Sequence, residues 1–187
     1  MHNVLIILAH PKTDSLNHSI ANLYKQEKEA QGKNVELLDL YKCDIQQRFF
    51  TFDDANNLEA TEEMKYFQNK IDSAQELVFV FPYWWGSSPA ILKNFLDWNL
   101  SKDFAFTYEK SRPIGLLDKQ VTVFTTTGAP SLVYTITGAN RRLKKMWKDQ
   151  IINFCGMKLK SFNIYGGVDT NKKNIEDILE KVHQVSQ

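Results

Sequence analysis

Apolar, β-rich stretches alternate along this chain with segments in which apolar residues recur at helical spacing. Five stretches predict buried strands, at residues 4–9, 35–40, 77–81, 121–126 and 162–165. The intervening and final segments predict helices, at about residues 15–31, 61–73 and 139–154, from residues 88–89 onward and from about residue 171 onward. Because this alternation requires right-handed crossovers, we expect an α/β fold with a doubly wound, five-stranded parallel sheet in the order 2-1-3-4-5.

Capping residues mark the ends of two of these helices. Ser15 can cap the first helix, and Gly32 fits the position just after its end. Ser88 followed by Pro89 predicts a capping residue and then proline at the first helical position. Two long segments, 43–58 and 99–117, lie outside the alternating pattern, and long connections of this kind usually carry function or form an interface.

Composition limits the class of protein. The 187 residues are 43% hydrophobic and 24% charged, so we expect one globular domain over residues 1–187. The formal net charge of +1 gives no global attraction to nucleic acid or to an anionic membrane, which favours a small-molecule partner. No apolar run fits a secretory signal or a membrane span, so we expect a cytoplasmic protein without membrane insertion.

The cysteines and histidines give no sign of a metal site. Cys43 and Cys155 show neither CxxC nor metal-ligand spacing, so we interpret both as reduced thiols. His2, His18 and His183 have no partners at metal-ligand spacing. We therefore expect no bound metal.

In a doubly wound sheet, ligands bind outside the carboxyl ends of the strands, near the point where the strand order reverses. Residues 10–17 follow the first strand there and lead into a helix. Free backbone N–H groups at a helix start favour an anion, and His10 and Asn17 add side-chain donors, so this turn is typical of a phosphate site. An ordinary strand-to-helix turn with a Ser15 cap would explain the same residues.

Large aromatic residues follow the third strand. Pro82, Tyr83, Trp84 and Trp85 would expose much apolar surface in a loop unless a flat group covered them. A planar heteroaromatic ring is one such cover. A core plug or a dimer interface is the alternative.

The loop after the fourth strand is polar. Thr126 and Thr127 offer hydroxyl groups, and Gly128 allows the backbone to approach a ligand closely. Tyr134 lies a few residues further along. Ordinary β-branched filling of a strand would also explain the threonines, but the three loops together favour a flavin site over any one of these alternatives.

With these motifs, the chain resembles the flavodoxin-like NAD(P)H:quinone oxidoreductases over nearly its whole length. The resemblance rests on segments 9–11, 15–17, 81–82, 84–85 and 89–93 and on Gly128 and Tyr134. It implies that four residues of the first turn hold the flavin phosphates, namely His10, Ser15, Leu16 and Asn17. It also implies that Pro82, Tyr83, Trp84 and Trp85 line the isoalloxazine ring, and that Thr126, Thr127 and Gly128 bind the polar edge of that ring.

Tyr134 matches a tyrosine that, in one branch of the family, helps stabilise charge on the reduced flavin. That branch has a histidine six positions later, where this chain has Asn140. An asparagine cannot accept a proton and become cationic, so a tyrosine–histidine relay cannot be carried over. We expect Tyr134 to act without a titrating partner at that position.

The function implied by the resemblance is hydride transfer from NAD(P)H, through FAD or FMN, to a quinone-like, azo or nitro acceptor. A homodimer is implied as well. A basic cluster (Arg141, Arg142, Lys144 and Lys145) could meet a phosphate of NADPH, although such clusters are more often solvated helix faces. Two other functions stay open: a regulatory flavoprotein subunit of a larger partner such as a potassium efflux system, and a single-electron carrier, which the net charge disfavours.

Overall fold

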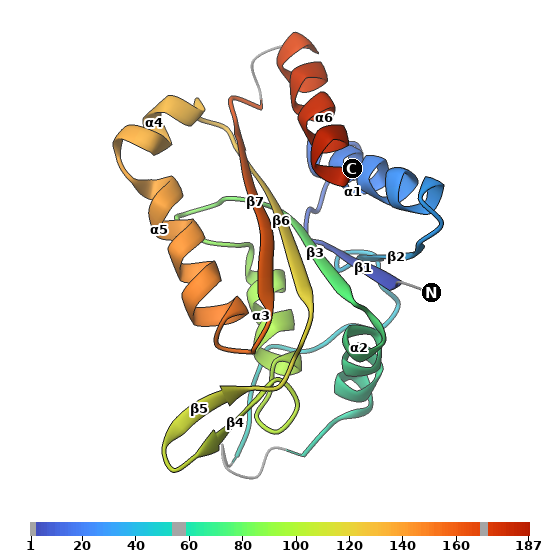
Figure 1. Cartoon of the computed structure of the whole chain (residues 1–187), viewed down its shortest axis with the longest axis vertical. Coiled ribbons are helices and arrows are strands. Elements are labelled where there is room, and N and C mark those ends of the chain that lie inside the picture. Colours follow the sequence, from blue (N-terminus) through green and yellow to red (C-terminus); the bar gives the residue numbers. More distant parts are fainter. Residues whose placement is uncertain (1–2, 54–58, 169–171) are drawn as a thin grey trace.

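The structure is a computed structural model that describes residues 3–53, 59–168 and 172–187 (Figure 1). Its main sheet has five parallel strands in the order β2-β1-β3-β6-β7. These strands are β1 (Asn3–Leu8), β2 (Asn34–Asp39), β3 (Glu76–Pro82), β6 (Gln120–Thr127) and β7 (Lys158–Gly166). Because β6 and β7 are the fourth and fifth strands of this sheet in the sequence, the predicted order 2-1-3-4-5 is confirmed.

Helices cover both faces of the sheet. They are α1 (Leu16–Ala30), α2 (Glu62–Ser73), α3 (Ala90–Asn99), α4 (Ser131–Ile136), α5 (Ala139–Met146), the π-helix η1 (Trp147–Ile152) and α6 (Lys172–Ser186). Figure 1 shows α1 and α6 side by side on one face, with α2, α3 and α5 on the other. The expected start of the last helix near residue 171 lies outside the described residues.

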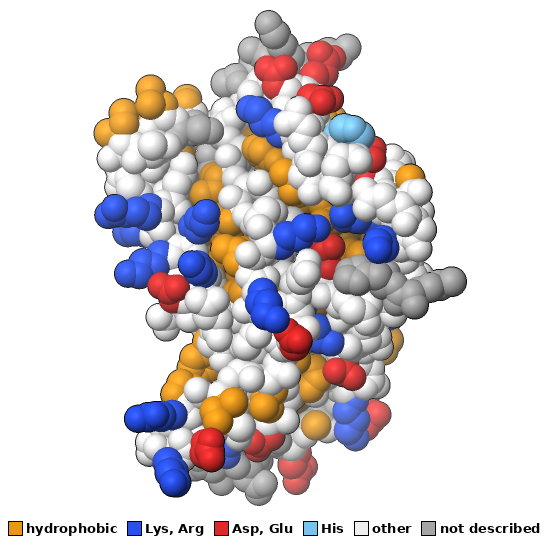
Figure 2. All heavy atoms as spheres, viewed as in Figure 1, with side chains coloured by type: hydrophobic (Ala, Val, Ile, Leu, Met, Phe, Trp, Pro, Cys, Tyr) orange, Lys and Arg blue, Asp and Glu red, His pale blue; other side chains and the backbone are white. Residues whose placement is uncertain are grey.

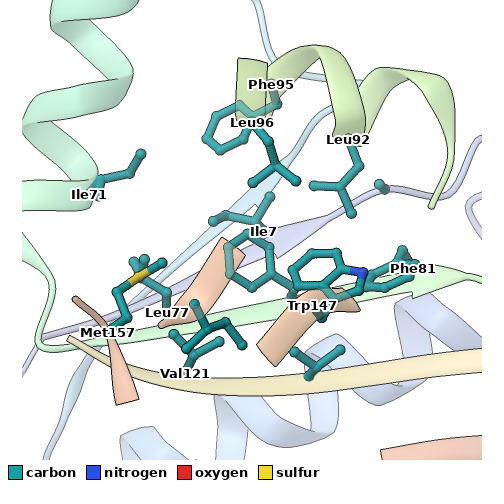
Figure 3. Close-up of a cluster of buried hydrophobic side chains, with 14 of the residues drawn as sticks. Ile7, Ile71, Leu77, Phe81, Leu92, Phe95, Leu96, Val121, Trp147 and Met157 are labelled. Carbon is teal, nitrogen blue, oxygen red and sulfur yellow. The ribbon is translucent and has the colours of Figure 1, made fainter. Parts of the chain in front are cut away.

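Alternate residues of the central strands supply two separate cores. Ile6 and Leu8 of β1 pack with Ile20 of α1 and Ile178 of α6. Ile7, next to them in the sequence, belongs to the opposite core, as expected for a strand buried on both faces. Figure 3 shows the second core, where the Phe81 and Trp147 rings stack with centroids 5.0 Å apart.

The long connection at 99–117 contains an antiparallel hairpin, β4 (Phe106–Glu109) and β5 (Arg112–Gly115), which the sequence pattern did not predict. The hairpin is attached at its end by a close backbone contact. A Cβ atom added to Gly115 would lie 2.0 Å from the Gly156 nitrogen, so only glycine fits there. The Leu117 N–H also donates to the Cys155 carbonyl at 2.8 Å.

The other long connection lies against α3 as far as the structure describes it. Trp98 donates its indole N–H to the Arg48 carbonyl at 2.8 Å, and the Phe50 N–H donates to the Asn94 side chain at 2.8 Å. The remainder of the predicted 43–58 segment includes residues 54–58, which lie outside the described part. The first half of this connection is therefore held by side chains of α3.

Two helix predictions were wrong in detail. The expected Ser88 cap with Pro89 at the first helical position is replaced by Pro89 at the N-cap, since the bridge between Trp84 and Ser87 holds the preceding residues in a turn. The expected continuous helix at 139–154 changes to a π-helix at Trp147, whose side chain is fully buried against the sheet. None of the described helices is long and apolar enough to cross a membrane.

Candidate functional site

Three loops that are distant in sequence meet at the carboxyl ends of β1, β3 and β6. Asn17 donates its amide N–H to the Thr126 hydroxyl at 2.8 Å, which joins the first loop to the third. The Tyr83 N–H donates to the Thr126 carbonyl at 2.8 Å, which joins the second loop to the third. The rings of His10 and Trp84 lie 5.7 Å apart and join the first loop to the second. The expected meeting of these loops is confirmed.

The first loop is fixed by local hydrogen bonds. Ser15 is the N-cap of α1, and its hydroxyl accepts from the His18 N–H at 3.4 Å. The Lys12 N–H donates to His10 Nδ1 at 3.1 Å. Burial lowers the pKa of His10, which favours its neutral form until an anion is nearby. Leu16 is half-buried at the first helical position, where backbone N–H groups lack intrahelical acceptors.

Asn17 supplies a test of whether the site fits a flavin. Its side chain is only 2% exposed, yet its Oδ1 atom has no hydrogen-bond partner. A buried carbonyl without a donor is costly, so a bound ligand or water that donates to this atom would be stabilising. The ribityl hydroxyls of a flavin could donate to it. After a 180° turn of the amide, Thr126 could donate to Oδ1 while the NH₂ group bound a phosphate. The donor set therefore fits a phosphate-bearing flavin.

The second loop begins inside the sheet. Pro82 is buried at the end of β3, and Tyr83 is buried directly after it. Trp84 is 42% exposed and Trp85 is fully exposed. Reciprocal backbone hydrogen bonds of 3.0 and 2.9 Å join Trp84 and Ser87. Since Trp85 and Gly86 both have positive φ, this reversal has the pattern of a type I′ turn and directs the Trp85 indole away from the rest of the chain.

The third loop carries hydroxyl groups and an exposed glycine. Thr126 and Thr127 are buried, and the Thr127 hydroxyl donates to the Ala129 carbonyl at 2.9 Å. Gly128 is exposed between them and α4. The polar donors of this loop are thus partly used within the loop, and the accessible backbone is at Gly128.

Tyr134 lies on α4 beside Tyr83, with ring centroids 5.4 Å apart. Burial raises the pKa of Tyr83, and the neighbouring Tyr134 raises it further, so its hydroxyl stays protonated as a donor. Asn140 donates weakly to the Thr135 hydroxyl at 3.4 Å, and its buried Oδ1 has no partner. Two phenols from different elements therefore border the same end of the sheet.

The basic cluster of α5 is exposed. Figure 2 shows its Lys and Arg side chains along one edge of the molecule, next to the apolar side chains of α4. The cluster consists of Arg141, Arg142, Lys144 and Lys145. Arg142 donates to the Thr137 carbonyl at 2.9 Å, which holds its side chain at the junction between α4 and α5. This arrangement is that of a solvated helix face.

Sequence reasoning missed His18 and Asp39. His18 Nε2 lies 3.0 Å from Asp39 Oδ2, and His18 Nδ1 lies 2.9 Å from Ser15 Oγ. The position of His18 three residues after the cap could have indicated its contact with Ser15. No local pattern indicates its contact with Asp39, which lies at the carboxyl end of β2.

Comparisons with known proteins place the chain in a family. A model described as flavodoxin-like fold matches residues 2–185. An uncharacterized NAD(P)H oxidoreductase from Haemophilus influenzae is 33% identical over 170 residues, which cover 89% of this chain and 84% of that protein. Human ribosyldihydronicotinamide dehydrogenase (quinone) is 31% identical over 179 residues, which cover 83% of this chain and 78% of that protein.

Among solved structures, an FMN-dependent NADH-azoreductase from Bacillus anthracis in complex with FMN superposes with a TM-score of 0.77. The identity is 19%, and the match covers 100% of this chain and 98% of that one. At this identity the likeness concerns the fold. Since the family model spans nearly the whole sequence and the sheet has the order that the motifs predicted, the chain belongs to the flavodoxin-like family.

Proposed function

We propose that this chain is a flavin-dependent NAD(P)H oxidoreductase that transfers two electrons as hydride to a quinone-like, azo or nitro acceptor. The observation that carries the proposal is the meeting of the capped turn before α1, an aromatic loop and a polar loop, with a buried, unpartnered Asn17 carbonyl at the start of that helix. The names of the two sequence relatives, an NAD(P)H oxidoreductase and a quinone-linked dehydrogenase, support the same reaction class.

The turn before α1 would hold the flavin phosphate. Backbone N–H groups of Leu16 and Asn17 lie at the start of a 15-residue helix, whose dipole favours an anion. His10 and Ser15 would add side-chain donors. FAD and FMN both carry a phosphate at the corresponding point, so both remain candidates, and the solved structure with FMN makes FMN the first probe.

The aromatic and polar loops would hold the isoalloxazine ring. Pro82, Tyr83 and Trp84 would border the flat faces of the ring. Trp85 would contact the ring, or a second molecule bound beside it, through its exposed indole. Thr126, Thr127 and Gly128 would bind its polar edge. When bound, a flavin supplies hydride acceptance and donation at one ring nitrogen.

Tyr134 is the proposed catalytic donor. Its phenol would stabilise negative charge that develops at the polar edge of the ring, and a donor placed where charge develops is typically worth a few kcal/mol. The adjoining Tyr83 restricts where the Tyr134 ring can lie, because the two centroids are 5.4 Å apart. Hydride transfer then needs no proton relay through Asn140.

We also propose a homodimer in the cytoplasm. A cavity of about 610 Å³ lies between α3, the hairpin and η1, with Leu96, Phe106 and Phe154 among its lining. The hairpin also exposes Tyr108 and Ile114. A second copy would cover this apolar surface. The free thiols of the two cysteines support a reducing compartment.

The alternative of a regulatory subunit receives no support from the relatives, whose names describe enzymes. Turnover of NADH or NADPH with a soluble naphthoquinone by the purified chain, with no partner protein present, distinguishes the two. Mass spectrometry of the cofactor released on denaturation identifies FAD or FMN. Folded protein that neither retains nor rebinds any flavin would refute the proposal, and light scattering would test the dimer separately.

A further inference from the structure

His18 belongs to a short chain of hydrogen bonds beside the turn at residues 10–17, which is the proposed phosphate site. Its Nε2 atom is 3.0 Å from Asp39 Oδ2 at the end of β2, and its Nδ1 atom is 2.9 Å from Ser15 Oγ. The His18 and Asp39 side chains are only 10% and 15% exposed. The chain of contacts ends at Ser15, the N-cap of α1, and the unpartnered Asn17 Oδ1 atom belongs to the same first turn of that helix.

The contacts determine the direction of each hydrogen bond. An aspartate carboxylate can only accept, so His18 must carry a hydrogen on Nε2. In the neutral imidazole Nδ1 is then an acceptor, and the Ser15 hydroxyl must donate to it. With a neutral His18, the single hydroxyl hydrogen of Ser15 is thus used inside the protein. It is unavailable to an anion in the turn.

Charged groups around His18 come from each neighbouring element. The His10 ring of the preceding turn lies 6.3 Å away, centroid to centroid, and Lys12 is close to His10. Lys42 Nζ, after β2, lies 3.9 Å from the same Asp39 oxygen that faces His18. The first turn of α1 itself has no acidic residue. Asp39 is therefore the acidic group that faces a protonated His18 among the described neighbours.

We propose that His18 is a positioning residue that aims the Ser15 hydroxyl at a phosphate and couples phosphate binding to uptake of one proton. This inference rests on the proposed function, in which the turn holds a flavin phosphate. Asp39 stabilises the protonated imidazole, and the phosphate provides the second negative charge that favours it.

The proton balance of the step is simple. One proton from solvent binds to His18 Nδ1, and the Nδ1–H now donates to Ser15 Oγ. The Ser15 O–H turns away from His18 and donates to a phosphate oxygen. No covalent bond to the flavin changes, and the added positive charge offsets one negative charge of the phosphate. Because the bound state holds the extra proton, phosphate-bearing flavins bind more tightly at low pH and lose this advantage as the pH rises.

Calorimetric titration of the flavin-free full-length chain with FMN tests the coupling. In buffers of different ionisation enthalpy, it measures the protons taken up per FMN bound. At about pH 8 a phosphate monoester is already a dianion, so the uptake reports on the protein. We expect uptake by the unaltered chain, less by His18→Gln, and none dependent on His18 when riboflavin replaces FMN. From about pH 6 to about pH 8, the FMN dissociation constant should rise about tenfold more in the unaltered chain than in His18→Gln.

The chain offers a matched control and a second measurement. His183 Nδ1 lies 3.0 Å from Glu27 Oε1, a histidine–carboxylate pair outside the site, so His183→Gln should keep the full uptake. Nitrogen NMR of the histidine rings in the unaltered chain reports the protonation of His18 directly, whatever the stability of the variant. FMN binding with equal uptake in His18→Gln, or with an unchanged His18 ring signal, overturns the coupling alone. Failure of FMN to bind the unaltered chain refutes the proposed function as well.

Discussion

Replacing Asn17 with leucine tests whether its amide serves a ligand or the fold. In the flavin-free protein the substitution removes one neutral hydrogen bond to Thr126, worth about 1 kcal/mol net. It also removes the buried Oδ1 atom that has no partner, whose burial costs about 1–3 kcal/mol. Leucine branches at Cγ as asparagine does, has no polar atom and is larger. The two hydrogen-bonding effects oppose each other, so, apart from the cost of fitting the larger side chain, the free energy of unfolding should change by no more than about 1 kcal/mol.

Flavin binding should respond far more strongly to the same change. A hydrogen bond to a charged group is worth about 1.5–3 kcal/mol, and its loss weakens binding about 10- to 150-fold. Urea unfolding of the flavin-free protein and fluorescence titration with FMN measure the two quantities separately. The expected result is a large loss of affinity with nearly unchanged stability.

Asn163→Leu is the matched control for Asn17→Leu. The Asn163 amide is half-buried and donates to the Val123 carbonyl at 3.1 Å and to the Ser161 hydroxyl at 3.0 Å. Its replacement should lower stability by about 1 kcal/mol and leave flavin affinity unchanged. If Asn17→Leu retained normal affinity, or lost stability and affinity in proportion, the amide would belong to the fold rather than to the site.

Three further predictions concern the hairpin, the proposed catalytic donor and the pH dependence of stability. Gly115→Ala should lower the free energy of unfolding by at least about 2 kcal/mol, because its Cβ would meet the Gly156 backbone. The Cβ of Gly32→Ala would meet nothing within 4 Å, so this variant should lose only about 1 kcal/mol, for its positive φ. Equal urea midpoints of the two variants would contradict this. Tyr134→Phe should slow flavin reduction by NAD(P)H about tenfold or more in stopped flow, whereas Asn140→Ala should have a mild effect; a full-rate Tyr134→Phe variant would remove the phenol from the reaction. Since burial lowers the pKa of His10, folding releases a proton from it, so its contribution to stability is present above about pH 6.5 and is lost as the pH falls. Urea midpoints of the flavin-free protein should therefore fall less on acidification in His10→Gln, and identical slopes would count against the burial effect.

The sheet could be predicted from sequence because its central strands β1, β3 and β6 are buried on both faces. A continuous apolar run such as the first one leaves few other structures open, and the helical segments between the runs then favour a doubly wound parallel sheet. The Ser15 cap was predictable for a similar reason, since a serine before an apolar helical stripe satisfies free N–H groups locally.

The unpredicted features depend on contacts between residues far apart in sequence. The hairpin is attached through the approach of Gly115 to Gly156, which no local pattern encodes. The change to a π-helix occurs at Trp147, whose buried indole stacks on Phe81. The contact of His18 with Asp39 requires knowing that β2 ends beside the first turn of α1. Such features need the three-dimensional arrangement.

The turn that carries Trp85 has a consequence for engineering this chain. A left-handed backbone costs a residue with a side chain about 1–2 kcal/mol, and the first central position of such a turn is normally asparagine or glycine. A screen for thermal stability alone would therefore favour Trp85→Asn or Trp85→Gly. It would thereby delete a fully exposed indole from the mouth of the candidate site, so variants selected for robustness should be counter-screened for turnover before they are combined.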